Sequence, residues 1–128
     1  MSCGHPEAAH FCLVFWRWCH WIDDTVDQDK KWDADTVLRV NLEALFAFSE
    51  NRFFQTHKFG LMPLVVQAFA AYGDSIQWEK RKSRRDRQAS DVLKSYYHEV
   101  FWHVAFLCGG YDHMRRMTEK YREFDYDV

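Results

Sequence analysis

Three aspartates in the first quarter of the chain have the residue type and spacing of a metal site. Asp23, Asp24 and Asp27 lie in the stretch HWIDDTVDQD, directly after the aromatic run FCLVFWRWCHW. On a helix at about 100° per residue these carboxylates and His20 fall within an arc of roughly 100°, beside an apolar stripe. Mg²⁺ prefers carboxylate oxygens and leaves coordination sites open for phosphate oxygens. The pattern therefore predicts Mg²⁺ bound by the three aspartates.

The carboxylates lie near the expected end of the helix, where a nearby positive charge would stabilise them. A helix that ends near residue 28 places them where its macrodipole is negative, so an unopposed cluster of anions there costs free energy. The sequence offers Lys30 and Lys31, the basic run at residues 79–87, or a bound metal ion. The alternative interpretation of the aspartates is thus a solvated or salt-bridged helix end.

The same stretch, WIDDTVDQD, resembles the first Asp-rich motif, DDxxD, of the class I isoprenoid and terpene synthases, including the squalene and phytoene synthase branch. In that family an aromatic-rich helix leads into the motif, which binds Mg²⁺ and the diphosphate of a prenyl substrate. The resemblance covers residues 15–29 and implies that Asp23, Asp24 and Asp27 bind metal and diphosphate. The family's second metal-binding motif is not found in this chain, so we take the resemblance as support for diphosphate binding rather than for prenyl chemistry.

A second group of residues with chemical potential is the pair Glu99 and His103 in the stretch HEVFWH. The two side chains lie one turn apart on the same face of a helix. They could add a metal ligand, since helical bundles assemble such sites from facing helices, or act as general base to a metal-bound water. The alternative is an internal hydrogen-bonded pair at the margin of the core.

The basic run from Glu79 to Arg87 carries six Lys or Arg against two acids. Arg84, Arg85 and Arg87 would neutralise phosphate charge, because guanidinium groups match phosphate oxygens. The alternatives are a solvated helix face, or a nucleic-acid contact with Trp78 as a stacking platform. The net charge of −2 argues against a surface devoted to nucleic acid.

Apolar residues recur at helical spacing along the chain, and predict the elements that must position these groups. A first helix is expected over residues 6–28, from Pro6 onward, and a second, capped by Asp33 or Asp35, should stop at Gly60. Leu38, Leu42, Leu45 and Phe46 of the second helix are expected to face inward.

Pro63 should open a third helix with a weak point at Gly73, because proline suits a first helical turn and glycine weakens a helix interior. A fourth helix is expected to begin near Ser90 or one turn earlier and to end at Gly109 and Gly110, and a short fifth follows.

Composition sets the class of protein. With 128 residues, 48% hydrophobic residues, five Gly and two Pro, we expect an all-α fold, a single-domain bundle of four to five helices. The longest uncharged run has 15 residues, below the roughly 20 that span a bilayer. We therefore expect no membrane crossing, and a cytoplasmic protein whose cysteines are free thiols. Trp16, Trp18 and Trp21 are too dense for one buried face, so at least one should point away from the Cys19 stripe, which would suit a homodimer. The alternative is a small bundle with helices on both sides of the first helix, which would bury it nearly all round.

The leading functional hypothesis from the sequence is a Mg²⁺-dependent protein that binds or hydrolyses a diphosphate-containing small molecule. Its metal ligands would be Asp23, Asp24 and Asp27. The alternative from another class is a non-catalytic helical interaction module, such as an adaptor or inhibitor, whose aromatic and charged patches bind a partner protein.

Overall fold

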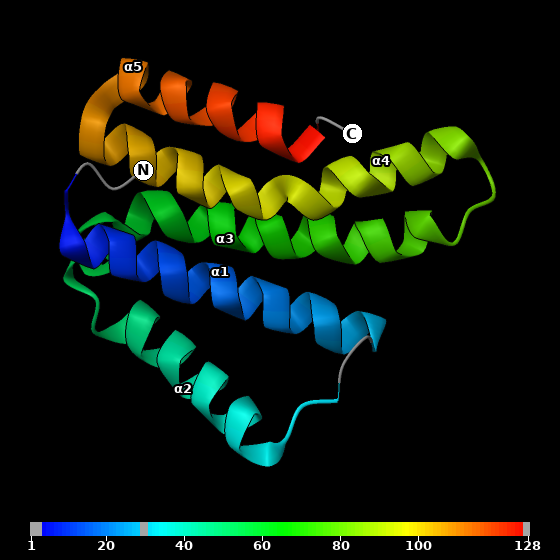
Figure 1. Ribbon diagram of the computed structural model, residues 1–128, viewed down its shortest axis with the longest axis horizontal. Helices are drawn as coiled ribbons and strands as arrows, with labels where there is room; N and C mark the ends of the chain where they lie inside the picture. Colours follow the sequence, from blue (N-terminus) through cyan, green and yellow to red (C-terminus); the bar gives the residue numbers. More distant parts are fainter. Residues whose placement is uncertain (1–3, 29–30, 127–128) are drawn as a thin grey trace. The chain divides into compact units, whose positions relative to one another are not determined.

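The computed structural model describes residues 4–28 and 31–126, and those residues form helices, turns and connectors without a strand (Figure 1). The all-α prediction of four to five helices is confirmed. In chain order the elements are α1 (Pro6–Asp27), α2 (Ala34–Ser49), α3 (Arg52–Glu79), α4 (Arg84–Lys94), the short 3₁₀ helix η1 (Ser95–Tyr97) and α5 (His98–Tyr126).

The chain divides into two compact units. The first unit, Ser2–Lys58, contains α1, α2 and the start of α3, and the second unit, Phe59–Val128, contains the rest of α3 and the elements that follow. The prediction of a single domain stays a prediction, because the division concerns packing along the chain and not independent folding.

The first unit is built on a cluster of four phenylalanine rings. Phe11 stacks on Phe15 and on Phe54, with ring centroids 5.9 and 5.1 Å apart. Phe48 meets Phe11 and Phe54 edge-on, at 5.8 and 5.0 Å. Stacked and edge-to-face pairs at such distances are the favourable arrangements of aromatic rings. The cluster therefore joins α1, the end of α2 and the start of α3.

The outward side of α2 overturns one of the sequence predictions. The helix buries its small residues Ala44 and Ala47, whereas Leu38 is 70% exposed and Leu45 is 63% exposed. Small side chains let helices approach closely, and this approach brings Phe48 into the aromatic cluster. The prediction of an inward leucine face is wrong, and the exposed face of α2 consists of Leu38, Leu42, Leu45 and Phe46.

The boundary between the second and third helices also differs from the prediction. α2 ends at Ser49, and α3 runs unbroken through Gly60, Pro63 and Gly73. The break comes from buried Asn51, whose Oδ1 accepts a hydrogen bond from the Phe54 N–H at 2.9 Å. The Asn51 side-chain amide donates to the carbonyl of Glu7, also at 2.9 Å. Asn51 thus starts α3 and connects it to α1.

The start of α2 follows the prediction. Asp33 is its N-cap residue and accepts a hydrogen bond from the Thr36 N–H at 2.7 Å. This hydrogen bond lowers the pKa of the Asp33 carboxyl below its ordinary value.

In the second unit, α3 and α4 are joined by polar contacts. The hydroxyl of buried Ser90 donates to the carbonyl of Ser75 at 2.8 Å, and Lys94 pairs with Glu79 at 3.0 Å. α4 begins after the N-cap Ser83, about two turns before Ser90 and within about one turn of the earlier start that the sequence also predicted.

The chain reverses direction within α5 (Figure 1) at Gly110, whose backbone is non-helical with φ 81° and ψ −173°. The predicted break at Gly109 and Gly110 is confirmed. After the reversal, Tyr121 contacts the rings of His98 and Trp102, with centroids 5.5 and 5.3 Å apart. The two arms of α5 therefore pack through an aromatic contact.

Replacing Asn51 should weaken the first unit. Asn51→Ala removes the α3 cap and leaves the Glu7 carbonyl without its donor, so we expect a loss of about 2–3 kcal/mol in the free energy of unfolding. Asn51→Asp keeps the acceptor for the Phe54 N–H but places a carboxylate oxygen against the Glu7 carbonyl oxygen, so it should be destabilised as well. Urea denaturation measures both. Asn41→Ala, which removes an exposed bond within α2, is the control and should stay within about 0.5 kcal/mol. An equal loss in both alanine variants would contradict this role.

The reversal at Gly110 gives a second prediction. A Cβ atom at Gly109 would lie 2.5 Å from Cγ of His113, so Gly109→Ala forces the two arms apart. We expect a loss of about 1–3 kcal/mol in a urea denaturation measurement. Adding His113→Gly removes both the ring and the Cβ atom of His113, which would lie 2.7 Å from the new methyl group, and should recover part of that loss. If the double variant is no more stable than Gly109→Ala, the overlap is not the cause.

Candidate functional site

The three predicted metal ligands lie at the end of α1. Asp23 and Asp24 are partly buried and Asp27 is exposed. The last turn of α1 contains no basic residue, and Gln28, with φ 57°, closes the helix by donating to the carbonyls of Asp24 and Thr25. None of the three aspartates is without an interaction partner. Because all three carboxylates lie in the last two turns of α1, they are at the negative end of the helix macrodipole, where a cation is favourable.

Aromatic side chains extend this acidic arc toward the start of the helix. Trp16 is exposed, which confirms that one of the three tryptophans points outward. Its ring lies 4.2 Å from that of His20, measured between centroids. The outer face of α1 therefore changes along its length from aromatic and imidazole groups to carboxylates.

Glu99 and His103 lie in the second unit. Glu99 is exposed, and His103 is partly buried. Nε2 of His103 lies 3.1 Å from where a Cβ atom of Gly60 would be, and its ring stacks on Phe106 at 6.1 Å. His103 therefore occupies space that the glycine leaves on α3. The predicted roles of Glu99 and His103 in catalysis stay predictions.

The arginines predicted to bind phosphate begin α4. Arg84, Arg85 and Arg87 are exposed in its first turn, after Ser83. The neighbouring Arg81 lies over the ring of Trp78, 4.5 Å from the ring centroid. Trp78, predicted as a stacking platform for a base, therefore already stacks with a guanidinium group.

The structure does not group the predicted ligands into a metal centre within a unit. Asp23, Asp24 and Asp27 belong to the first unit, and Glu99 and His103 to the second. Within either unit, no three described His, Cys, Asp or Glu side chains lie close enough together to hold a metal ion. The Mg²⁺ hypothesis therefore depends on the aspartates of α1 together with water or a ligand's own oxygens.

Cysteine chemistry contributes little to the site. Cys12, Cys19 and Cys108 are not joined in disulfides, and Cys3 lies outside the described residues. Burial raises the pKa of Cys19 to about 12. Since the thiolate is the nucleophile and metal ligand, Cys19 is inert at neutral pH.

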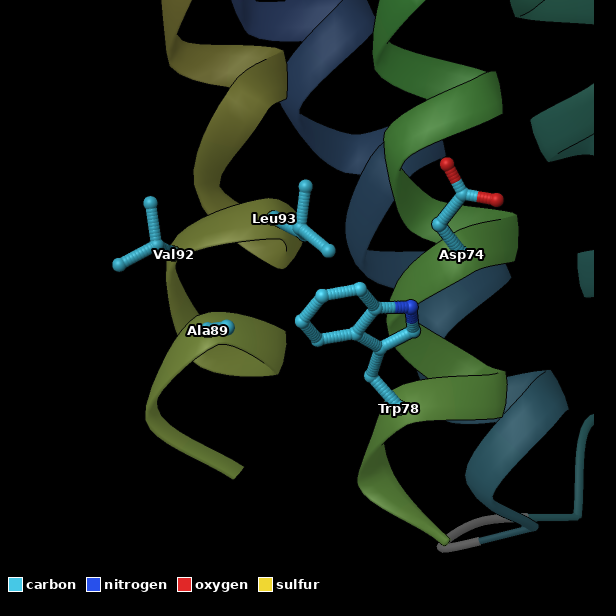
Figure 2. A pocket seen from close by; sticks show the side chains of 5 residues that line it. All are labelled: Asp74, Trp78, Ala89, Val92 and Leu93. Atoms are coloured by element: carbon cyan, nitrogen blue, oxygen red, sulfur yellow. The ribbon is translucent and has the colours of Figure 1, made fainter. Parts of the chain in front are cut away.

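A cavity of about 460 Å³ lies in the second unit between α3 and α4. Figure 2 shows the indole of Trp78 between the two helices, with Ala89, Val92 and Leu93 on the α4 side and Asp74 on α3. Asp74 is the single charged residue of this lining, and Arg84, Arg85 and Arg87 are not part of it. An apolar cavity with one carboxylate suits apolar or cationic groups rather than a diphosphate.

Two exposed apolar faces were not predicted as functional surfaces. One is the outer face of α2, and the other lies on α3 between Phe59 and Gly73. The sequence signal was present, because the helical stretches at residues 34–49 and 59–73 carry apolar residues on two opposite sides. Among the described helices, α3 is also long and apolar enough to span a membrane, by length and composition alone. The prediction of no membrane crossing stays a prediction.

Comparison with protein-family models, with curated proteins and with solved structures gave no match. The resemblance to the Asp-rich motif of isoprenoid synthases therefore stays a prediction from residues 15–29.

The magnesium hypothesis predicts that millimolar Mg²⁺ raises the melting temperature, because a ligand that binds only the native state stabilises it. Asp23→Asn combined with Asp27→Asn should abolish the rise, as measured by circular dichroism melts. Asp91→Asn with Asp112→Asn removes the same charge from exposed positions of the second unit and is the matched control. A flat wild-type response, or a rise that survives in the Asp23 and Asp27 variant, contradicts the hypothesis.

Proposed function

We propose that the protein is a non-catalytic helical interaction module that binds a basic amphipathic helix of a partner protein on the exposed face of α2. The observation that carries the proposal is the row of large apolar side chains on that face. Exposed apolar patches of this kind in soluble proteins mark interaction sites.

The spacing of these side chains supports a helical partner. Leu38, Leu42, Leu45 and Phe46 stand at i, i+4, i+7 and i+8, so they line one side of α2 over about two turns. All four are more than half exposed. A partner helix recognised in this way presents its own apolar anchors at i, i+3, i+4 and i+7.

Charge beside this face supports a basic partner. Asp35, Glu43 and Glu50 follow one edge of the face, and Arg39 is the single basic residue of α2. The Arg39 guanidinium donates to the Asp35 carboxylate at 2.6 Å, so that positive charge is compensated within the helix. The edge is therefore net acidic, and lysines or arginines on the partner would complement it.

The energy available from this face is moderate. Burying a whole leucine or phenylalanine side chain gains about 1.5–3 kcal/mol, and these four are already partly covered. After the costs of association and of ordering a helix, we expect a dissociation constant in the micromolar range.

A synthetic amphipathic peptide with leucine on one face and lysine on the other tests the proposal by fluorescence anisotropy. We expect micromolar binding to the wild type. Leu42→Asp with Leu45→Asp should raise the dissociation constant at least about 10-fold, because two charges replace the apolar anchors. The added aspartates would attract the lysines, so this loss isolates the apolar contribution.

Two controls make the result specific. Gln88→Asp adds one negative charge at an exposed position of α4, near Asp91, which is left in place. This variant should bind the peptide with the dissociation constant of the wild type. A peptide with glutamate in place of lysine should bind more weakly, because the edge of α2 is acidic. No binding of the basic peptide, or equal binding by the Leu42 and Leu45 variant, refutes the proposal.

The second candidate function is Mg²⁺-dependent binding or hydrolysis of a diphosphate-containing small molecule. The observation that favours it is the position of Asp23, Asp24 and Asp27 in the last two turns of α1, with no basic residue in the final turn. The melting experiment above separates it from the interaction module, because peptide binding at α2 requires no metal.

A further inference from the structure

We infer that α3 binds a second copy of this chain, antiparallel, through an apolar face centred on Val66. Four exposed side chains form the main part of this face: Phe59 (87% exposed), Met62 (42%), Val66 (61%) and Phe69 (46%). Gly73 continues the row and is also exposed. The face lies within the second unit and shares no residue with the α2 surface, so the inference does not rest on the proposed function.

The spacing of the face fits helix-to-helix packing. Residues 59, 62, 66, 69 and 73 are separated by three, four, three and four positions. This alternation keeps side chains on one side of a helix, and it is the pattern by which two helices interlock along their length. The opposite side of α3 is buried in its own chain through Leu61, Val65 and Ala68.

The order of large and small residues makes the face complementary to itself. In an antiparallel pair related by a two-fold axis at Val66, residues on the two copies are level when their numbers are equally far from 66. Phe59 is then level with Gly73 of the second copy, and Met62 is level with Ala70. Large side chains meet small ones at both ends, which is the condition for close packing of two helices.

Charge also favours a second copy over other occupants. No charged residue occurs from Phe59 to Gly73, so the whole face is neutral. A nucleic acid or a charged protein surface would lose its hydration here without gaining a partner for its charges. The same face on another copy is equally neutral and brings no such penalty.

The exposed area is enough for a weak dimer. A whole large side chain has a surface of roughly 150–250 Å². The exposed fractions of the four side chains therefore add up to about 400 Å² of accessible surface per copy, or about 800 Å² for the pair. Pro63 and Ala70 are exposed on the same side and extend the area toward the roughly 1,000 Å² at which specific interfaces begin. We therefore expect a dissociation constant in the micromolar range.

Sedimentation velocity over a series of concentrations, from submicromolar to submillimolar, measures the dimer of the full chain. Val66→Glu places two carboxylates against each other at the two-fold axis and should raise the dissociation constant at least about 100-fold. Gln67→Glu adds the same charge to the next, exposed position at the side of the face and should change it less than about 5-fold. Because Val66 is exposed, the circular dichroism melt of Val66→Glu should match that of the wild type when both are recorded well below the wild-type dissociation constant, where both are monomers.

The register has its own test. Gly73→Leu fills the space level with Phe59 of the second copy and should weaken the dimer at least about 10-fold. Adding Phe59→Ala exchanges the large and small positions, and should restore the dissociation constant to within about 3-fold of the wild type. Phe59→Ala alone should weaken the dimer, because its side chain supplies the largest exposed area of the face.

Three results would overturn the inference. One is a wild type that stays monomeric at all concentrations. Another is a dimer that Val66→Glu does not weaken, which would place the contact elsewhere. The third is a monomer that floats with phosphatidylcholine vesicles and loses flotation in Val66→Glu, which would make the face a lipid contact.

Discussion

The packing of Phe11, Phe15, Phe48 and Phe54 determines the arrangement of the first unit. Phe48 lies in the last turn of α2 and Phe54 in the first turn of α3, so the cluster holds both sides of the short connector between them. Once Phe48 turns inward, the helical period brings Ala44 and Ala47 to the same side and directs the leucines of α2 outward. The exposed face of α2 is therefore a consequence of the aromatic core, and any change that loosens the cluster should also change that face.

Signals that act within one helical turn could be predicted from the sequence, and those that depend on distant residues could not. Asp33 and Gly110 end or begin helices through their own backbone or side chain, and both were predicted. Pro63 is tolerated inside α3 because the carbonyl it leaves unpaired belongs to Phe59, on the exposed side, where water can replace the bond. The actual start of α3 depends on Asn51 and on the carbonyl of Glu7, 44 positions away.

The same distinction applies to the candidate sites. That the aspartates of α1 share one arc follows from local geometry, and so does the contact of Trp16 with His20. The direction of His103 depends on Gly60, which the chain brings against it from another helix. The leucines of α2 were predicted to face inward because they are the more hydrophobic residues. The structure buries the alanines instead, because their smaller side chains let the helices approach more closely. When apolar residues occur on both sides of a helix, the sequence shows that either side can be buried. It does not show which of the two sides packs against the core.

The two exposed faces differ in a way that bears on their partners. The face of α2 carries only large side chains beside an acidic edge, so it lacks the small positions that would receive a second copy of itself. The face of α3 is neutral and carries Gly73 and Ala70 at the positions that receive Phe59 and Met62 of another copy. A diphosphate held directly by side chains would need cationic groups around a cavity, whereas the cavity beside Trp78 has one carboxylate and apolar walls. Shape and charge are therefore the grounds on which we propose a basic foreign helix as the partner of α2 and a second copy of the chain as the partner of α3.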